Sequence, residues 1–138
     1  MKTDEIQAFA YDWEGRTILL VEDDEYSIDY IGELLSLAKA DCEHALNGID
    51  AMRLYKSMPH IDLVLMDIRL PDINGYDLTR SMHQINPDIP IIAQTAYSYD
   101  TDREKAMEAG CVDFMTKPIS QSKLFITLDE YLHKKSPN

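Results

Sequence analysis

Short apolar runs alternate along the chain with longer segments in which apolar residues recur at helical spacing. The short runs are mostly solid rather than alternating, which is typical of strands buried on both faces of a parallel sheet. Five strands are predicted, at Thr17–Val21, Asp41–Ala45, Asp62–Met66, Ile89–Gln94 and Cys111–Met115, with the weakest pattern at Asp41–Ala45. The alternation predicts a doubly wound α/β fold with helices on both faces of the sheet.

Five helices are expected after these strands, because apolar residues repeat there every three or four positions. Their apolar faces are Ile28, Ile31, Leu35 and Ala38; Ala51, Tyr55 and Met58; Gly75, Leu78, Met82 and Ile85; a segment Asp100–Ala109; and Leu124, Leu128, Tyr131 and Leu132. Gly110 is expected to end the fourth helix, since glycine commonly terminates helices. The dipeptides Asn47–Gly48 and Asn74–Gly75 are expected to be simple turns. The full pattern is (βα)5.

A length of 138 residues fits a single domain. Residues 1–15 show no clear period and are expected to be an N-terminal extension or linker. The folded domain is expected over residues 16–135, followed by a short tail over residues 136–138.

The net charge of −12 comes from 13 Lys and Arg against 25 Asp and Glu. This charge opposes binding to a phosphate backbone or an anionic membrane surface, so direct DNA binding is not expected. The apolar runs are too short for a secretory or membrane-spanning segment, and a cytoplasmic location is expected. Cys42 and Cys111 have no metal-ligand or redox spacing and are expected to be buried thiols.

Chemically reactive residue types stand where four of the predicted strands end. Because ligands bind beyond the carboxyl ends of the strands in open α/β sheets, these positions indicate one common site. They are Glu22, Asp23 and Asp24 after the first strand, Asp67 after the third, Thr95 after the fourth, and Thr116 and Lys117 after the fifth.

Carboxylates gathered so closely need a cation, and a set of oxygen ligands with open positions suits Mg²⁺. An anionic phosphoryl group can approach such a site, with one carboxylate as the nucleophile. Lys117 would neutralise the developing charge, and the Thr95 hydroxyl would donate a hydrogen bond. The pattern therefore predicts an aspartyl phosphate.

Four segments resemble the receiver domain of two-component response regulators: Ile18–Asp24, Asp62–Gly75, Pro90–Ala96 and Gly110–Pro118. The resemblance extends from about Arg16 to His133. Within this family, the chain is similar to the receivers of hybrid histidine kinases and to single-domain regulators. It implies a flavodoxin-like sheet of five parallel strands in the order 2-1-3-4-5.

The resemblance also implies roles for individual residues. Asp67 would be the phosphoacceptor, and Lys117 and Thr95 would contact the phosphoryl oxygens. The implied Mg²⁺ ligands are Asp23 directly, Glu22 through water, Asp67, and the backbone carbonyl of Arg69. Asp24 would have no direct role.

A conformational switch is expected through Thr95 and Phe114, where many family members carry Tyr in place of Phe114. Arg69 and Tyr97 are expected to set the lifetime of the phosphate, because both would stand close to the attacking water. The resemblance further implies a cis peptide between Lys117 and Pro118.

The expected function is a phosphoacceptor in a two-component phosphorelay. A phosphohistidine on a histidine kinase or a His-containing phosphotransfer protein would donate to Asp67, and the change would switch a surface for an unknown output partner. A homodimer on activation is compatible with this function. No turnover of a separate substrate is expected, so the chain would catalyse only its own phosphorylation and dephosphorylation.

Three alternative functions fit these residues less well. A flavin- or nucleotide-binding module needs a Gly-rich or hydroxyl-rich loop after the first strand, where this chain is acidic. A haloacid-dehalogenase-like phosphatase needs Asp-x-Asp, where Arg69 replaces the second Asp. A scaffold that is never phosphorylated has no need of the complete set of acids, Thr95 and Lys117. Taken singly, each of these residues also fits a helix start, a loop cap or a solvated charge.

Overall fold

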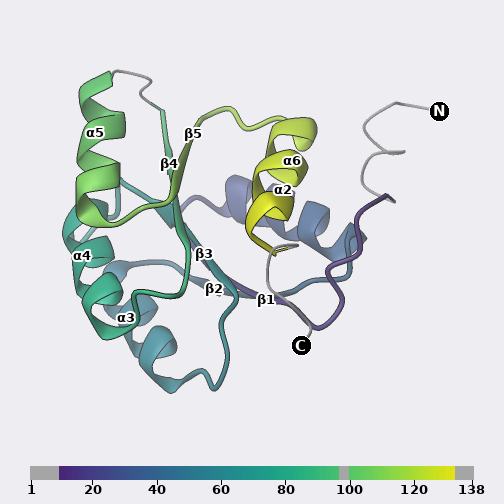
Figure 1. Cartoon of the computed structure of the whole chain (residues 1–138), viewed down its shortest axis with the longest axis horizontal. Helices are drawn as coiled ribbons and strands as arrows, with labels where there is room; N and C mark the ends of the chain where they lie inside the picture. The colour runs from purple at the N-terminus through teal and green to yellow at the C-terminus, as the bar shows by residue number, and fades with distance from the viewer. Residues whose placement is uncertain (1–9, 97–99, 133–138) are drawn as a thin grey trace.

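The computed structural model describes residues 10–96 and 100–132, which form one parallel sheet covered by helices (Figure 1). The strands pair in the order β2-β1-β3-β4-β5, and every pairing is parallel. Their bounds are β1 Thr17–Val21, β2 Asp41–Ala45, β3 Leu63–Asp67, β4 Ile91–Thr95 and β5 Asp113–Thr116. The predicted fold class and strand order are confirmed.

Two groups of helices cover the two faces of the sheet. Their bounds are α2 Glu25–Leu37, α3 Gly48–Ser57, α4 Gly75–Ile85, α5 Asp100–Ala109 and α6 Gln121–Leu132. Helices α2 and α6 pack on one face, and α3, α4 and α5 pack on the other (Figure 1). Because side chains alternate along a strand, neighbouring residues enter different layers, so that Ile92 meets α2 and α6 while Ala93 meets the other three helices.

Some strands start later than the sequence pattern predicts. The amide of Cys111 donates to the carbonyl of Ala106, and this hydrogen bond closes the end of α5. Strand β5 therefore begins only at Asp113. Asp62 is fully buried before β3, where its carboxylate accepts the amide of Thr17 at 2.8 Å. The structural role of Asp62 is thus to tie the start of β1 to the start of β3. Strand β2 is mostly exposed because it lies at the edge of the sheet.

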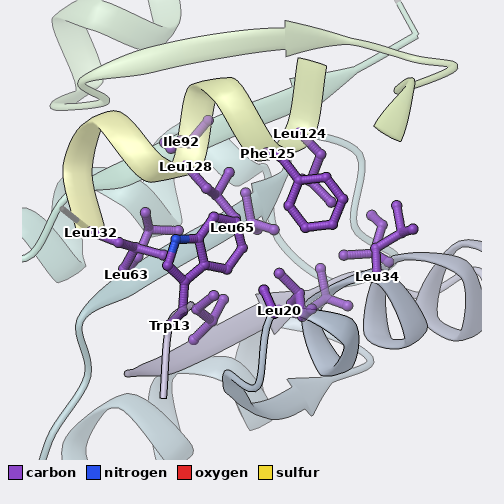
Figure 2. Close-up of a cluster of buried hydrophobic side chains, with 14 of the residues drawn as sticks. Trp13, Leu20, Leu34, Leu63, Leu65, Ile92, Leu124, Phe125, Leu128 and Leu132 are labelled. Carbon is purple, nitrogen blue, oxygen red and sulfur yellow. The ribbon is translucent and has the colours of Figure 1, made fainter. Parts of the chain in front are cut away.

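The segment before β1 is part of the folded domain, which corrects the expected boundary at residue 16. Trp13 is only 2% exposed and lies in one cluster with Phe125 and leucines of the sheet, α2 and α6 (Figure 2). Its indole Nε1 donates to Asp129 at 2.9 Å, its backbone amide donates to Ala38, and Tyr11 stacks on Phe125. Residues 11–15 were missed because so short a segment has no measurable period.

We expect replacement of Trp13 by Ala to lower the free energy of unfolding by about 3–5 kcal/mol, because a buried indole is lost and a cavity remains. Trp13→Phe should lose less, since most of the packing survives and only the hydrogen bond to Asp129 disappears. Urea unfolding followed by circular dichroism measures both changes. Glu14→Ala, at an exposed neighbouring position, is the matched control. A Trp13→Ala chain as stable as the control would contradict the assignment of this segment to the core.

Candidate functional site

The candidate site lies at the carboxyl edge of the sheet, where three central strands end. Glu22 directly follows β1, Asp67 is the last residue of β3, and Thr95 is the last residue of β4. All three are buried, although the rest of these strands is almost entirely apolar. Parallel pairing brings the strand ends to one edge, and this places residues 45 and 28 positions apart in the sequence beside each other.

An acidic cluster forms the centre of the site. Carboxylate oxygens of Glu22, Asp23 and Asp67 lie within 4.8 Å of one another. Glu22 and Asp67 are buried, whereas Asp23 is exposed. Three hard oxygen donors with one side open to solvent match the coordination chemistry of Mg²⁺.

Lys117 joins the two buried acids. Its ammonium Nζ lies 2.8 Å from Glu22 Oε1 and 3.5 Å from Asp67 Oδ2. Partial burial alone would lower the pKa of Lys117, but the hydrogen bond to Glu22 and the charges of Asp67 and Glu22 outweigh burial and raise it. Lys117 is therefore a fixed positive charge inside the site. The amide of Lys117 also donates to the carbonyl of Thr95, and the peptide bond to Pro118 is cis.

Asp67 is held in an environment that favours its protonated form when no metal is bound. Burial, followed by the hydrogen bond and the negative charge of Glu22, raises its pKa to about 7. The amide of Arg69, at 3.0 Å from Asp67 Oδ1, and the Lys117 charge act in the opposite direction but do not cancel the rise. The two carboxylates thus compete for one neutralising charge.

The loop after β3 folds back tightly against the strand. The amide of Gly75 donates to Ile68 at 2.9 Å, and a Cβ at Gly75 would lie 2.6 Å from Ile68 Cα and 2.7 Å from the Asp67 carbonyl oxygen. Only glycine permits this approach of α4 to the phosphoacceptor candidate. The sequence pattern marked Asn74–Gly75 as a turn, but Asn74 is in fact the N-cap of α4, with its side chain accepting the amide of Tyr76.

A second loop contact was also missed from the sequence. Asp72 accepts the amides of Gly48 and Ile49 at 2.7 and 2.9 Å, and the hydrogen bond from Gly48 lowers the pKa of Asp72. This contact ties the loop after β3 to the start of α3, where Asn47 is a helix N-cap rather than only a turn residue. The spacing of 24 residues gave no local signal for it.

The remaining candidate residues are not members of the acidic cluster of Glu22, Asp23 and Asp67. Arg69 and Thr95 line a cavity of about 590 Å³ beside Asp67, on the side of α4 and α5. Phe114 is 7% exposed and pairs with Ala93, so its ring is already buried in this structure. Asp24 caps α2 by accepting the amide of Ser27. Tyr97 lies outside the described residues.

Comparison with known proteins identifies the family. The family model of the response regulator receiver domain matches residues 18–129 of this chain. The chain belongs to this family. The receiver is 30% identical over 119 residues to the polar-differentiation response regulator DivK of Brucella ovis, a match that covers 85% of this chain and 96% of DivK.

Solved receiver structures share the same fold. The receiver domain of sensor histidine kinase PA1611 from Pseudomonas aeruginosa has a TM-score of 0.80 and 33% identity, covers 87% of this chain and 99% of that one, and holds a magnesium ion in its active-site cleft. A CheY-like receiver from Methanospirillum hungatei has a TM-score of 0.81 at 25% identity, covering 86% of this receiver and 94% of that chain. Within residues 10–96 and 100–132, no helix of this receiver is long and apolar enough to cross a membrane.

We expect Asp67 to make the metal-free receiver less stable as the pH rises. An unfolded Asp ionises near pH 4, whereas folding raises the pKa of Asp67 to about 7. The folded chain therefore binds this proton more tightly, and the stability gained from it is present at low pH and lost between about pH 4 and 7. Asp67→Asn should abolish this pH-dependent loss of stability. It should raise the free energy of unfolding by about 1–3 kcal/mol at pH 7, with a smaller difference at low pH.

Thermal unfolding in a chelator, at several pH values between 4 and 7.5, measures the effect. Asp29→Asn, which alters an exposed acid on α2, is the matched control. Equal pH profiles for the wild type, Asp67→Asn and Asp29→Asn would show that Asp67 is not held as described.

Proposed function

We propose that this receiver accepts a phosphoryl group on Asp67 from a protein phosphohistidine. The observation that carries the proposal is the bridge from Lys117 to both Glu22 and Asp67 at the edge of an acidic cluster. A lone buried carboxylate would be repelled by an incoming phosphoryl group, but here a fixed ammonium lies 3.5 Å from the Asp67 oxygen. Membership of the receiver family supports the same conclusion.

The transfer is a substitution at phosphorus. A carboxylate oxygen of Asp67 attacks, a P–O bond forms, the P–N bond breaks, and the donor imidazole leaves with the electron pair. Lys117 neutralises the charge on the phosphoryl oxygens, and the hydroxyl of Thr95 donates a hydrogen bond to one of them. The phosphoryl group is lost in a separate step, in which water attacks phosphorus, the P–O bond to Asp67 breaks, and phosphate leaves while the carboxylate is restored.

Glu22, Asp23 and Asp67 would hold Mg²⁺, with the carbonyl of Arg69 as a further ligand. When bound, Mg²⁺ would neutralise the acidic cluster and the phosphoryl oxygens. The magnesium ion in the PA1611 receiver supports this choice of metal. Because Glu22 is fully buried against Lys117, its part in the site is to hold the lysine as well as to complete the acidic set.

The donor would be a histidine kinase or a His-containing phosphotransfer protein that docks over the open side of the acidic cluster. We propose no separate substrate, so catalysis is limited to the chain's own phosphorylation and dephosphorylation. Arg69 lines the cavity next to Asp67, where it would act with Tyr97 on the lifetime of the phosphate.

Phosphorylation would change a surface through Thr95 and Phe114, and an output partner or a second copy of the chain would bind to the changed surface. A phosphoryl oxygen on Asp67 offers an acceptor to the Thr95 hydroxyl, and movement of Thr95 alters the end of β4. Phe114 pairs with Ala93 on that strand and is already buried. Because Phe has no hydroxyl to leave unpaired, the inward position of the Phe114 ring is stable before phosphorylation. The movement of Thr95 would then alter the packing of α5.

We expect Asp67→Ala to abolish phosphorylation of the intact chain. With Mg²⁺ and acetyl phosphate or phosphoramidate, intact mass spectrometry should show one added phosphoryl group on the wild type, labile to alkali and hydroxylamine as an acyl phosphate is. Asp77→Ala, at an exposed acid on α4, should be labelled like the wild type. Undiminished labelling of Asp67→Ala, or a wild type that no donor labels, would refute the proposal.

We expect Asp23→Asn to weaken Mg²⁺ binding by about tenfold or more, because a carboxylate ligand becomes a neutral amide. The same change should raise the melting temperature without metal, since it relieves repulsion among the three acids. Isothermal titration and thermal unfolding measure the two effects. Asp24→Asn is the matched control, because Asn preserves the α2 cap while removing an adjacent charge. If Asp23→Asn binds Mg²⁺ as tightly as Asp24→Asn does, Asp23 is not a ligand.

A further inference from the structure

A second cavity, of about 540 Å³, lies on the other face of the sheet from the cavity beside Arg69. It is bounded by the start of α2, the end of β4 and the connection from β5 to α6. Its walls are mostly apolar or aromatic, with Tyr26, Tyr30, Ile31, Pro118 and Ile119 among the lining residues. A volume of roughly 300–1,000 Å³ with mainly apolar walls is typical of small-molecule sites.

Gln94 is the unusual residue in this cavity wall. Its side chain is 0% exposed, and within the described parts of the chain neither Oε1 nor Nε2 has a hydrogen-bond partner. Ile92, two residues earlier on the same strand, packs in the apolar layer beneath α2 and α6, and the alternation of strand side chains directs Gln94 to that same layer. A buried amide with both groups unpaired is destabilising, so a partner for it should be strongly favoured.

The chemistry of the wall defines what such a partner must offer. The Gln94 amide presents one acceptor next to one donor, which is complementary to a carboxamide or lactam edge. Tyr26 and Tyr30 favour a planar ring, and Tyr30 is fixed by the bond from its hydroxyl to the carbonyl of Ile119 at 3.0 Å. Lys117 also lines the cavity, but its ammonium is already engaged by Glu22 and Asp67. An anionic ligand would therefore gain little from this ammonium group.

We propose that this cavity binds a small, neutral, planar molecule with an amide edge, which is recognised by Gln94. This site goes beyond phosphoacceptance, and its occupation can be measured without any phosphoryl transfer. Only its consequence depends on the proposed function: a ligand packed against Lys117 would change the rate at which Asp67 is phosphorylated.

The test uses benzamide as the probe, titrated into the full chain and followed by two-dimensional NMR. We expect saturable shifts at the side-chain amide of Gln94 and at Tyr30 and Ile119. Acetophenone has the same ring and acceptor but no donor, and it should bind at least about fivefold more weakly. Gln94→Met should weaken benzamide binding by a similar factor and abolish the preference over acetophenone. Gln84→Met, on the exposed face of α4, should bind both probes like the wild type.

Equal affinity of the wild type for the two probes would overturn the proposal, as would benzamide binding that Gln94→Met leaves unchanged. Absence of benzamide shifts at the cavity would overturn it as well. If Gln94→Met does not fold, the comparison of the two probes on the wild type still decides. A chain that is phosphorylated on Asp67 but binds no probe refutes only this inference, whereas a chain that binds benzamide but is never phosphorylated refutes only the proposed function.

Discussion

The ion bridge from Lys117 to Glu22 and Asp67 is the interaction on which the functional edge of this receiver depends. Two carboxylates are buried within reach of each other, and one ammonium group must compensate both. Removing the ammonium would leave buried negative charge unpaired, which is far more costly than losing a surface ion pair. Even with the bridge in place, the pKa of Asp67 is raised to about 7, so compensation is incomplete. Binding of an added cation would therefore stabilise the site. This conclusion follows from the burial of the two acids alone and does not depend on the function of the site.

The parallel sheet makes this arrangement possible. Strands β1, β3 and β4 are buried on both faces, so their ends are fixed by hydrogen-bonded neighbours and by two apolar layers. The same rigidity holds the loop after β3 against the strand, where Gly75 admits α4 and Asp72 anchors the start of α3. The backbone thus positions Asp67 through contacts that involve none of the reacting groups. A substitution at Gly75 would disturb the site by displacing this loop, although Gly75 has no chemistry of its own.

The sequence was sufficient for the features that depend on local pattern. Apolar runs located the five strands, and acids at strand ends located the cluster of Glu22, Asp23 and Asp67. It was insufficient where packing between distant segments decides the outcome. Trp13 contacts Asp129, 116 residues away, and nothing near Trp13 in the chain indicates that contact. The starts of some strands also shifted by one or two residues. Asp62 is held across the fold by the amide of Thr17, and Cys111 belongs to the end of α5 through its hydrogen bond to Ala106.

Gln94 and Thr95 illustrate the same limit within the site itself. In the sequence they are adjacent polar residues at the end of one strand, and only the hydroxyl has an obvious chemical role. The alternation of side chains sends them to opposite faces of the sheet, so Thr95 lines the cavity with Arg69 while Gln94 lines the cavity with Tyr30. Any movement of the end of β4 is consequently shared by both cavities. A ligand on the Gln94 side and a phosphoryl group on the Thr95 side would act on one rigid strand end, and their binding would be coupled in both directions by thermodynamic linkage.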